Sequence, residues 1–144
     1  MIQIIFIPIV AGLLCQLLKL LISAAKGEFS WGEINSYGGM PSSHAAFVSS
    51  LAFVAGYYEG WNSVAFAIAV VFAILTIRDA IGFRRTLGKH AQVINEVIHL
   101  LPESKRTVFK TMPTRLGHTP IEALAGIIIG IAVPFIYIIF SRYF

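Results

Sequence analysis

The sequence predicts an all-α integral membrane protein, a helical bundle of about four transmembrane helices with one interfacial amphipathic helix. Of its 144 residues, 57% are hydrophobic and only 12% are charged, whereas soluble domains average about 45–50% apolar and about 25% charged residues. The mean hydropathy of +0.79 agrees with this composition. Such a chain is neither disordered nor fibrous, and most soluble enzymes are excluded as well. We expect residues 1–144 to form a single domain.

Four apolar runs predict the membrane spans. The first covers residues 2–25 and contains one charge, Lys19. It is too long for the core of a signal peptide, so we expect a retained helix. The second span is shorter and partly polar, from Pro41 to Tyr58, and residues 59–62 are typical of a tight turn. The remaining spans are predicted over residues 60–77 and 123–141.

An amphipathic helix is predicted between the third and fourth spans. Its apolar residues recur at steps of three and four and form one stripe: Leu87, Ala91, Ile94, Val97, Ile98 and Leu101. Basic residues precede the stripe, at Arg84, Arg85 and Lys89. A helix of this kind suits the boundary between head groups and acyl chains, so we expect it to lie in the membrane interface.

The basic residues predict the topology. With four spans, the loops 26–43 and 83–119 lie on one side of the membrane, and both termini lie on the other. Eight of the 11 Lys and Arg residues are in these two loops: Lys26, Arg84, Arg85, Lys89, Lys105, Arg106, Lys110 and Arg115. The positive-inside rule therefore predicts that the side with these two loops is cytoplasmic. We expect the positive charge to serve anionic lipid head groups, with no nucleic-acid partner.

Three polar clusters fall on this basic side, within residues 38–44, 78–90 and 115–122. The first and third precede helices, whose N-terminal N–H groups can bind anions. The second supplies guanidinium groups, which match phosphate oxygens. If the second cluster formed a continuous helix, four of its residues would share one face: Arg78, Gly82, Arg85 and Lys89.

Each cluster also has a purely structural interpretation. Ser42 or Ser43 could cap a helix, Glu122 could complete a capping box that begins at Thr119, and the arginines could only set the topology. Together, however, two histidines, an acid and several arginines make up the set needed for phosphoryl transfer. That reaction needs a nucleophile, an orienting carboxylate, a general acid and cationic groups.

Two of these motifs resemble those of the type 2 phosphatidic acid phosphatase (PAP2) superfamily. The run Pro41-Ser42-Ser43-His44 resembles its P-S-G-H motif, and His118 followed by Glu122 resembles its H-x3-D motif. The fuller pattern, G-G-M-P-S-S-H, then R-D-A-x-G-x-R-R, then L-G-H-T-P-x-E, is similar to the small divergent PAP2 family of bacterial and plastid membrane proteins. The match covers nearly the whole chain. The resemblance implies a protein of the bacterial cell membrane, and we expect its active face to be the basic, cytoplasmic side.

The resemblance implies roles for the matching residues. His118 would be the nucleophile that forms a phosphohistidine, and Glu122 would orient it. His44 would protonate the leaving lipid oxygen, while Ser42 and Ser43 would bind phosphate oxygens.

The chain departs from the superfamily pattern in its basic residues. The superfamily's first motif, K-x6-R-P, is absent upstream of His44, and Arg115 precedes His118 by three positions instead of six. The phosphate clamp is therefore expected from other basic residues: Arg78, Arg84, Arg85, Lys89 and Arg115. His90 is the alternative nucleophile, because Arg84 lies six positions before it, although Ile94 stands where the acid would be.

These inferences predict a phosphatase that needs neither a metal nor another cofactor. Its substrate would be a lipid phosphate or pyrophosphate, such as phosphatidylglycerol phosphate, phosphatidate or an isoprenyl phosphate. The alternatives are a non-enzymatic protein that binds lipid head groups, or a small transporter or channel subunit. Membrane lipids are the other expected partners, and a homo-oligomer is predicted through the small-xxx-small pair Gly126 and Gly130.

Overall fold

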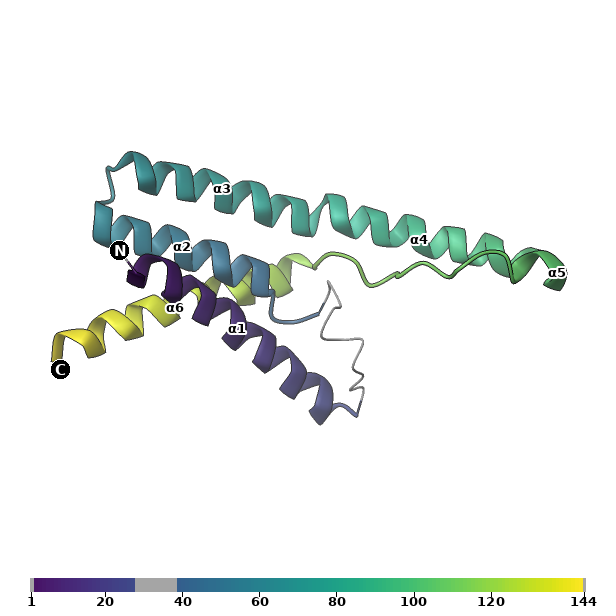
Figure 1. The fold of residues 1–144 in the computed structure, drawn as a ribbon, viewed down its shortest axis with the longest axis horizontal. Coiled ribbons are helices and arrows are strands. Elements are labelled where there is room, and N and C mark those ends of the chain that lie inside the picture. Colours follow the sequence, from purple (N-terminus) through teal and green to yellow (C-terminus); the bar gives the residue numbers. More distant parts are fainter. Residues whose placement is uncertain (1, 28–38, 144) are drawn as a thin grey trace.

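The protein is a bundle of helices, seen here in a computed structural model that describes residues 2–27 and 39–143 (Figure 1). The helices are α1 (Ile2–Ala25), α2 (Ser43–Glu59), α3 (Val64–Ile81), α4 (Phe83–Leu100), α5 (Glu103–Arg106) and α6 (Pro120–Tyr143). No strand occurs in the described ranges, so the all-α prediction is confirmed. Three helical stretches are long and apolar enough to cross a membrane: α1, α6 and the run of α3 with α4.

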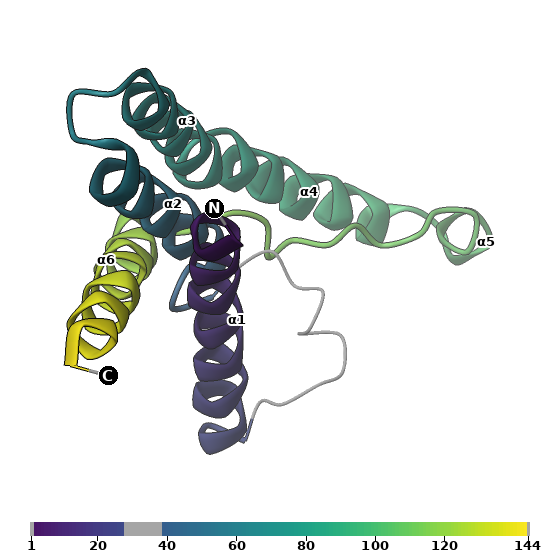
Figure 2. The same ribbon diagram turned by 60° about the vertical axis from the view of Figure 1, so that its left-hand side comes forward.

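Helix α2 is the centre of the bundle and corresponds to the second predicted span. It packs against α1 and α6 on one side and α3 on the other (Figure 2). Its buried residues are small or medium-sized, which lets neighbouring helices approach closely: Ala45, Ala46, Val48, Ser49, Ser50, Val54, Ala55 and Gly56. The outer helices expose large apolar side chains, including Leu13 and Ile68, each 64% exposed. An apolar exterior of this kind suits contact with lipid.

The glycine pair Gly126 and Gly130 mediates the contact between α6 and α2. A Cβ atom at Gly126 would collide with the carbonyl oxygen of Ser42, and one at Gly130 would collide with that of Ala46. The close approach expected from the sequence is therefore made within the chain. This face has no room for a second copy, because α2 already occupies it. Homo-oligomerisation itself stays a prediction, through some other surface.

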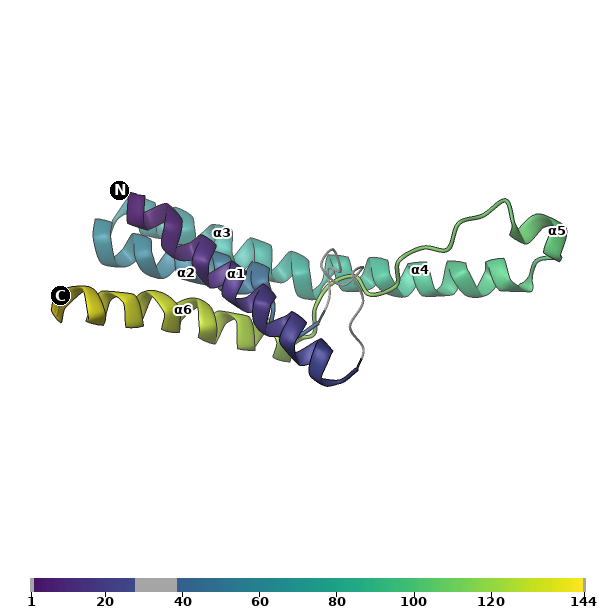
Figure 3. The ribbon, with the colours of Figure 1, turned by 60° about the horizontal axis from the view of Figure 1, so that its bottom comes forward.

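Helix α4 takes a direction that the sequence did not predict. It continues the line of α3 and does not turn across it (Figures 1 and 3). The hydrogen bonding continues through the junction, since Gly82 N–H donates to Arg78 O at 2.9 Å and Gly82 O accepts from Thr86 N–H at 3.0 Å. The amphipathic helix is present, and it extends α3 along the same axis.

The segment after α5 packs along one side of α4 and covers part of its apolar stripe. This segment, residues 107–119, runs back along α4 towards α6 (Figure 3). Asn95 holds it by a pair of hydrogen bonds to Met112, donating to the carbonyl oxygen at 2.9 Å and accepting from the N–H at 2.8 Å. Gly88 also lies so close to Thr114 O that a Cβ would be only 2.7 Å away. One side of α4 is therefore covered by protein.

The three polar clusters meet at one end of the bundle. The N-terminus, the C-terminus and the α2–α3 turn lie at the opposite end (Figure 1). The connection into α2, the α3–α4 junction and the connection into α6 lie together, as the predicted topology requires.

The orientation in the membrane is testable with single cysteines in a Cys15→Ala background. Ser104 and Asn62 are both exposed and lie near opposite ends of the bundle. If the basic end is cytoplasmic, Asn62→Cys should react with a membrane-impermeant thiol reagent in intact cells. Ser104→Cys should react only after the membrane is opened. Labelling of Ser104→Cys in sealed cells would place the basic end outside.

Candidate catalytic and phosphate-binding site

Backbone hydrogen bonds join the three clusters. Ser42 N–H donates to Glu122 O at 3.1 Å, which ties the start of α2 to the first turn of α6. His118 N–H donates to Ala80 O at 3.0 Å, which ties the connection before α6 to the end of α3. Gly117 makes the second contact possible, because its φ of +80° suits glycine and a Cβ there would collide with Arg85 N. Residues far apart in the sequence are thus held in one site.

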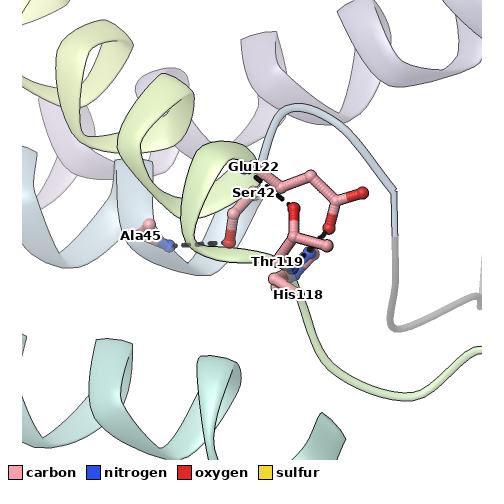
Figure 4. Close-up of polar contacts among 5 residues, drawn as sticks. All are labelled: Ser42, Ala45, His118, Thr119 and Glu122. Atoms are coloured by element: carbon pink, nitrogen blue, oxygen red, sulfur yellow. Dashed lines mark hydrogen bonds and ion pairs between the residues drawn. The ribbon is translucent and has the colours of Figure 1, made fainter.

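Glu122 and Thr119 form a capping box at the start of α6 (Figure 4). Thr119 N–H donates to Glu122 Oε2 at 2.8 Å, and Glu122 N–H donates to Thr119 Oγ1 at 3.3 Å. The same Oε2 atom lies 3.5 Å from His118 Nδ1. The capping interpretation and the orienting role are therefore compatible, since the cap holds the carboxylate beside the imidazole.

His118 is a buried histidine with one open position in its hydrogen bonding. Its side chain is only 5% exposed, and Nδ1 makes no hydrogen bond among the described residues. The 3.5 Å contact with Glu122 is an ion-pair distance and is long for a hydrogen bond. Burial lowers the pKa of His118 below its ordinary value of 6.5, and the nearby Glu122 carboxylate opposes this only in part. Burial therefore favours the neutral imidazole, which is the form that can act as a nucleophile.

His44 lies beside His118, in the first turn of α2. The centroids of the two rings are 6.4 Å apart and the rings are tilted by 54°. A small void separates this pair from α3 and α4, lined also by Thr76, Asp79 and Arg84. Arg84 Nε donates to Asp79 Oδ2 at 2.7 Å, so this guanidinium is partly neutralised.

A cavity of about 490 Å³ opens beside His118 and Glu122. Its wall contains four basic side chains: Lys19 and Lys26 from the C-terminal half of α1 and the residue after it, Arg85 from α4 and Arg115 from the segment before α6. We refer to it as the basic cavity. Among the described residues that line it, four are cationic and one is a carboxylate, which favours an anion with several oxygens. Such an anion would lie next to the histidine.

Lys19 and Lys26 were not among the candidate site residues of the sequence. Lys19 is only 7% exposed, and Gly39 leaves room for it, because a Cβ there would lie 3.1 Å from Lys19 Cε. The available signal was that Lys19 is an isolated charge inside an apolar run. A charge in a membrane span is costly and is by default functional.

The structure brings some of the predicted residues together and leaves others outside. Arg85, Arg115, His118 and Glu122 line the basic cavity, while Arg84 lies on the far side of the two histidines. Arg78, Lys89 and His90 are exposed and do not line it. The single basic face predicted from Arg78 to Lys89 is interrupted, because Gly82 departs from helical dihedrals with φ −103° and ψ −83°.

The two serines also take different places. Ser42 is completely buried and its Oγ accepts a hydrogen bond from Ala45 N–H at 3.3 Å, so it is the N-cap of α2 (Figure 4). Ser43 is half-buried and lines a separate, apolar hollow. Neither lines the basic cavity. In the described ranges, His, Cys, Asp and Glu side chains form no group of three that could hold a metal ion.

Comparison with known proteins places this arrangement in a family. Residues 2–133 match the sequence profile of the divergent PAP2 family. The chain belongs to the divergent PAP2 family. It is also 36% identical over 115 residues to the uncharacterized membrane protein YuiD of Bacillus subtilis (strain 168), covering 72% of this chain and 73% of that protein. No solved structure matches it.

Membership of the divergent PAP2 family confirms the resemblance inferred from the motifs. The matched range includes His44, His118 and Glu122. The family and the membrane-protein relative agree with the apolar helices of the bundle. The basic cavity adds a set of cations that the motifs do not contain, and these cations lie beside His118 and Glu122.

Proposed function

We propose that this protein is a membrane phosphatase that hydrolyses a lipid phosphate through a phosphohistidine on His118. The observation that carries this proposal is the pair of buried His118 and half-buried Glu122 at the wall of a cavity with four basic side chains. The cations would bind the phosphate and stabilise the charge of its oxygens in the transition state. The carboxylate would accept a hydrogen bond from Nδ1–H and so keep the lone pair on Nε2.

The reaction would proceed in two steps. His118 Nε2 attacks phosphorus and forms an N–P bond as the P–O bond to the lipid breaks. The departing lipid oxygen takes a proton from His44 and leaves as an alcohol. Water then attacks the phosphohistidine and gives a proton back to His44, the N–P bond breaks, and inorganic phosphate departs.

The direct test is phosphate release by the purified protein in detergent micelles. Phosphatidate, phosphatidylglycerol phosphate and an isoprenyl phosphate form a suitable panel. We expect at least one of these lipids to yield inorganic phosphate with multiple turnovers. Binding of the lipids without any release would instead support the non-enzymatic alternative, a protein that binds lipid head groups.

The dependence of the rate on pH should report the titration of His118. The neutral imidazole is the nucleophile, and burial lowers the pKa of His118. The acidic limb of the profile, where His118 gains a proton and the rate falls, should therefore have its midpoint below pH 6.5.

Glu122→Gln provides the matched control for this profile. The Glu122 carboxylate raises the pKa of His118, so its removal should move the acidic limb to a still lower pH while the maximal rate falls. Titration of the substrate is the same for both proteins and cancels in the comparison. A shift of the limb to higher pH in Glu122→Gln would contradict the assignment of His118 as the titrating group.

A further inference from the structure

A second hollow of about 500 Å³ lies beside the basic cavity, between α1, α2 and α3. Its lining is almost wholly apolar, with Ile9, Gly12 and Leu13 from α1, Phe47 from α2 and Phe72 from α3. We refer to it as the apolar groove. Leu13 is 64% exposed and Phe72 is 50% exposed, so the groove opens on the outer, apolar surface of the bundle.

The apolar groove and the basic cavity follow one another along a single face of α1. Residues of α1 line the groove at Ile9, Gly12 and Gln16, and the same helix and the residue after it line the basic cavity at Lys19, Ser23 and Lys26. The steps between these positions alternate between three and four, which keeps all six on one side of a helix. The two hollows are therefore arranged end to end.

His44 is the residue of the apolar groove whose ring lies near a histidine of the basic cavity, His118. It lines the apolar groove, whereas His118 lines the basic cavity, and the centroids of their rings are 6.4 Å apart. A phosphate in the basic cavity would have His118 at its phosphorus and His44 towards the groove. The ester oxygen that His44 protonates is the atom from which the lipid chain continues.

We infer that the apolar groove binds the hydrocarbon chain of the substrate, an inference that rests on the proposed function. The substrate class is then a phosphate monoester whose apolar chain begins close to the phosphate. The occupant follows from the chemistry at both ends: anion-binding cations at one end, an apolar wall at the other and the proton donor between them. Chain length is consequently part of the recognition.

The test compares hexadecyl phosphate with butyl phosphate, which share the phosphate and differ in the chain. Gly12→Leu should fill the groove, because the nearest side-chain atoms to a Cβ at Gly12 are those of Phe47, at 3.6 Å and 3.7 Å. We expect the ratio of kcat/KM for hexadecyl phosphate over butyl phosphate to fall by about tenfold or more. Gly12→Ala adds one methyl group in ordinary contact and should lower the ratio far less.

A second variant and a control keep the test decisive. Phe72→Ala removes a half-exposed wall of the groove and should raise KM for hexadecyl phosphate with little change in kcat, as expected when uniform binding is lost. Leu21→Ala, 56% exposed on α1 and outside both hollows, should leave the ratio unchanged. Thermal stabilisation of each protein by the two phosphates gives a binding measurement that needs no turnover.

The outcomes separate this inference from the proposed function. Equal loss on both substrates in Gly12→Leu, or no loss on either, would overturn the inference and leave the phosphatase intact. If no protein releases phosphate but hexadecyl phosphate stabilises the wild type and not Gly12→Leu, the groove assignment holds and the phosphatase fails. If hexadecyl phosphate stabilised the wild type and Gly12→Leu to the same extent, the groove would be filled by ordinary membrane lipid and not by the substrate chain. That outcome would overturn the inference.

Discussion

His118→Ala should abolish phosphate release, with a loss on the order of 10⁴-fold or more, as when the nucleophile of a catalytic unit is removed. No other histidine among the described residues combines burial with a neighbouring carboxylate, since His118 Nδ1 lies 3.5 Å from Glu122 Oε2 and the side chain is 5% exposed. When turnover is stopped, the wild type should carry a phosphoryl group on His118, and the variant should carry none.

His90→Ala is the matched control for this prediction. His90 is exposed on α4 and does not line the basic cavity, so its removal should leave the rate within about twofold of the wild type. Because truncation of a buried ring can destabilise the fold, His118→Asn offers a second variant that keeps a polar side chain there. Turnover by His118→Ala together with loss in His90→Ala would exchange the two assignments.

The helices were predictable because their signals are local. Apolar runs, the Ser42 cap and the capping box before α6 all act within a few residues. The direction of α4 was not predictable in this way. It depends on the hydrogen bonds through Gly82 and on the segment that Asn95 holds against α4, and neither has a local sequence signature.

The contact between His118 and Glu122 was predictable for the same reason, since they are four residues apart on either side of a helix start. The set of cations in the basic cavity was not predictable, because its members come from separate elements. Lys19 and Lys26 reach the basic cavity from α1, nearly a hundred positions before His118. Only the packing of α1 against α2 and α6 brings them there.

The serines illustrate a limit of motif reasoning. Ser42 occupies a motif position that the superfamily resemblance assigns to phosphate binding, yet here it is the buried N-cap of α2. A serine before a helix satisfies both interpretations in the sequence, and only its burial distinguishes them. The alternative that the sequence left open, a capping role, is the one that the geometry of Ser42 favours.

Arg85→Ala should weaken catalysis strongly, because Arg85 lines the basic cavity beside His118. Loss of one preorganised donor from a water-excluded site costs roughly 10²–10³-fold in kcat. Because the side chains of Arg85 and Arg115 are exposed, we expect a loss towards the lower end of that range. Arg115→Ala should act in the same way, while Arg85→Lys should recover only part of the rate, since an ammonium cannot make the paired hydrogen bonds of a guanidinium. The measurement is kcat on the lipid phosphate that the purified protein hydrolyses best.

Arg78→Ala is the decisive comparison, because the sequence placed Arg78 and Arg85 on one basic face and the structure separates them. Arg78 is exposed and does not line the basic cavity, so its replacement should change kcat by less than about threefold, and Lys105→Ala in exposed α5 should do the same. If all of these variants lost activity equally, the protein would act through a diffuse positive surface. A loss confined to Arg85 and Arg115 would instead require a discrete phosphate site. In such a site the two positive charges lie where negative charge develops on the phosphate oxygens in the transition state.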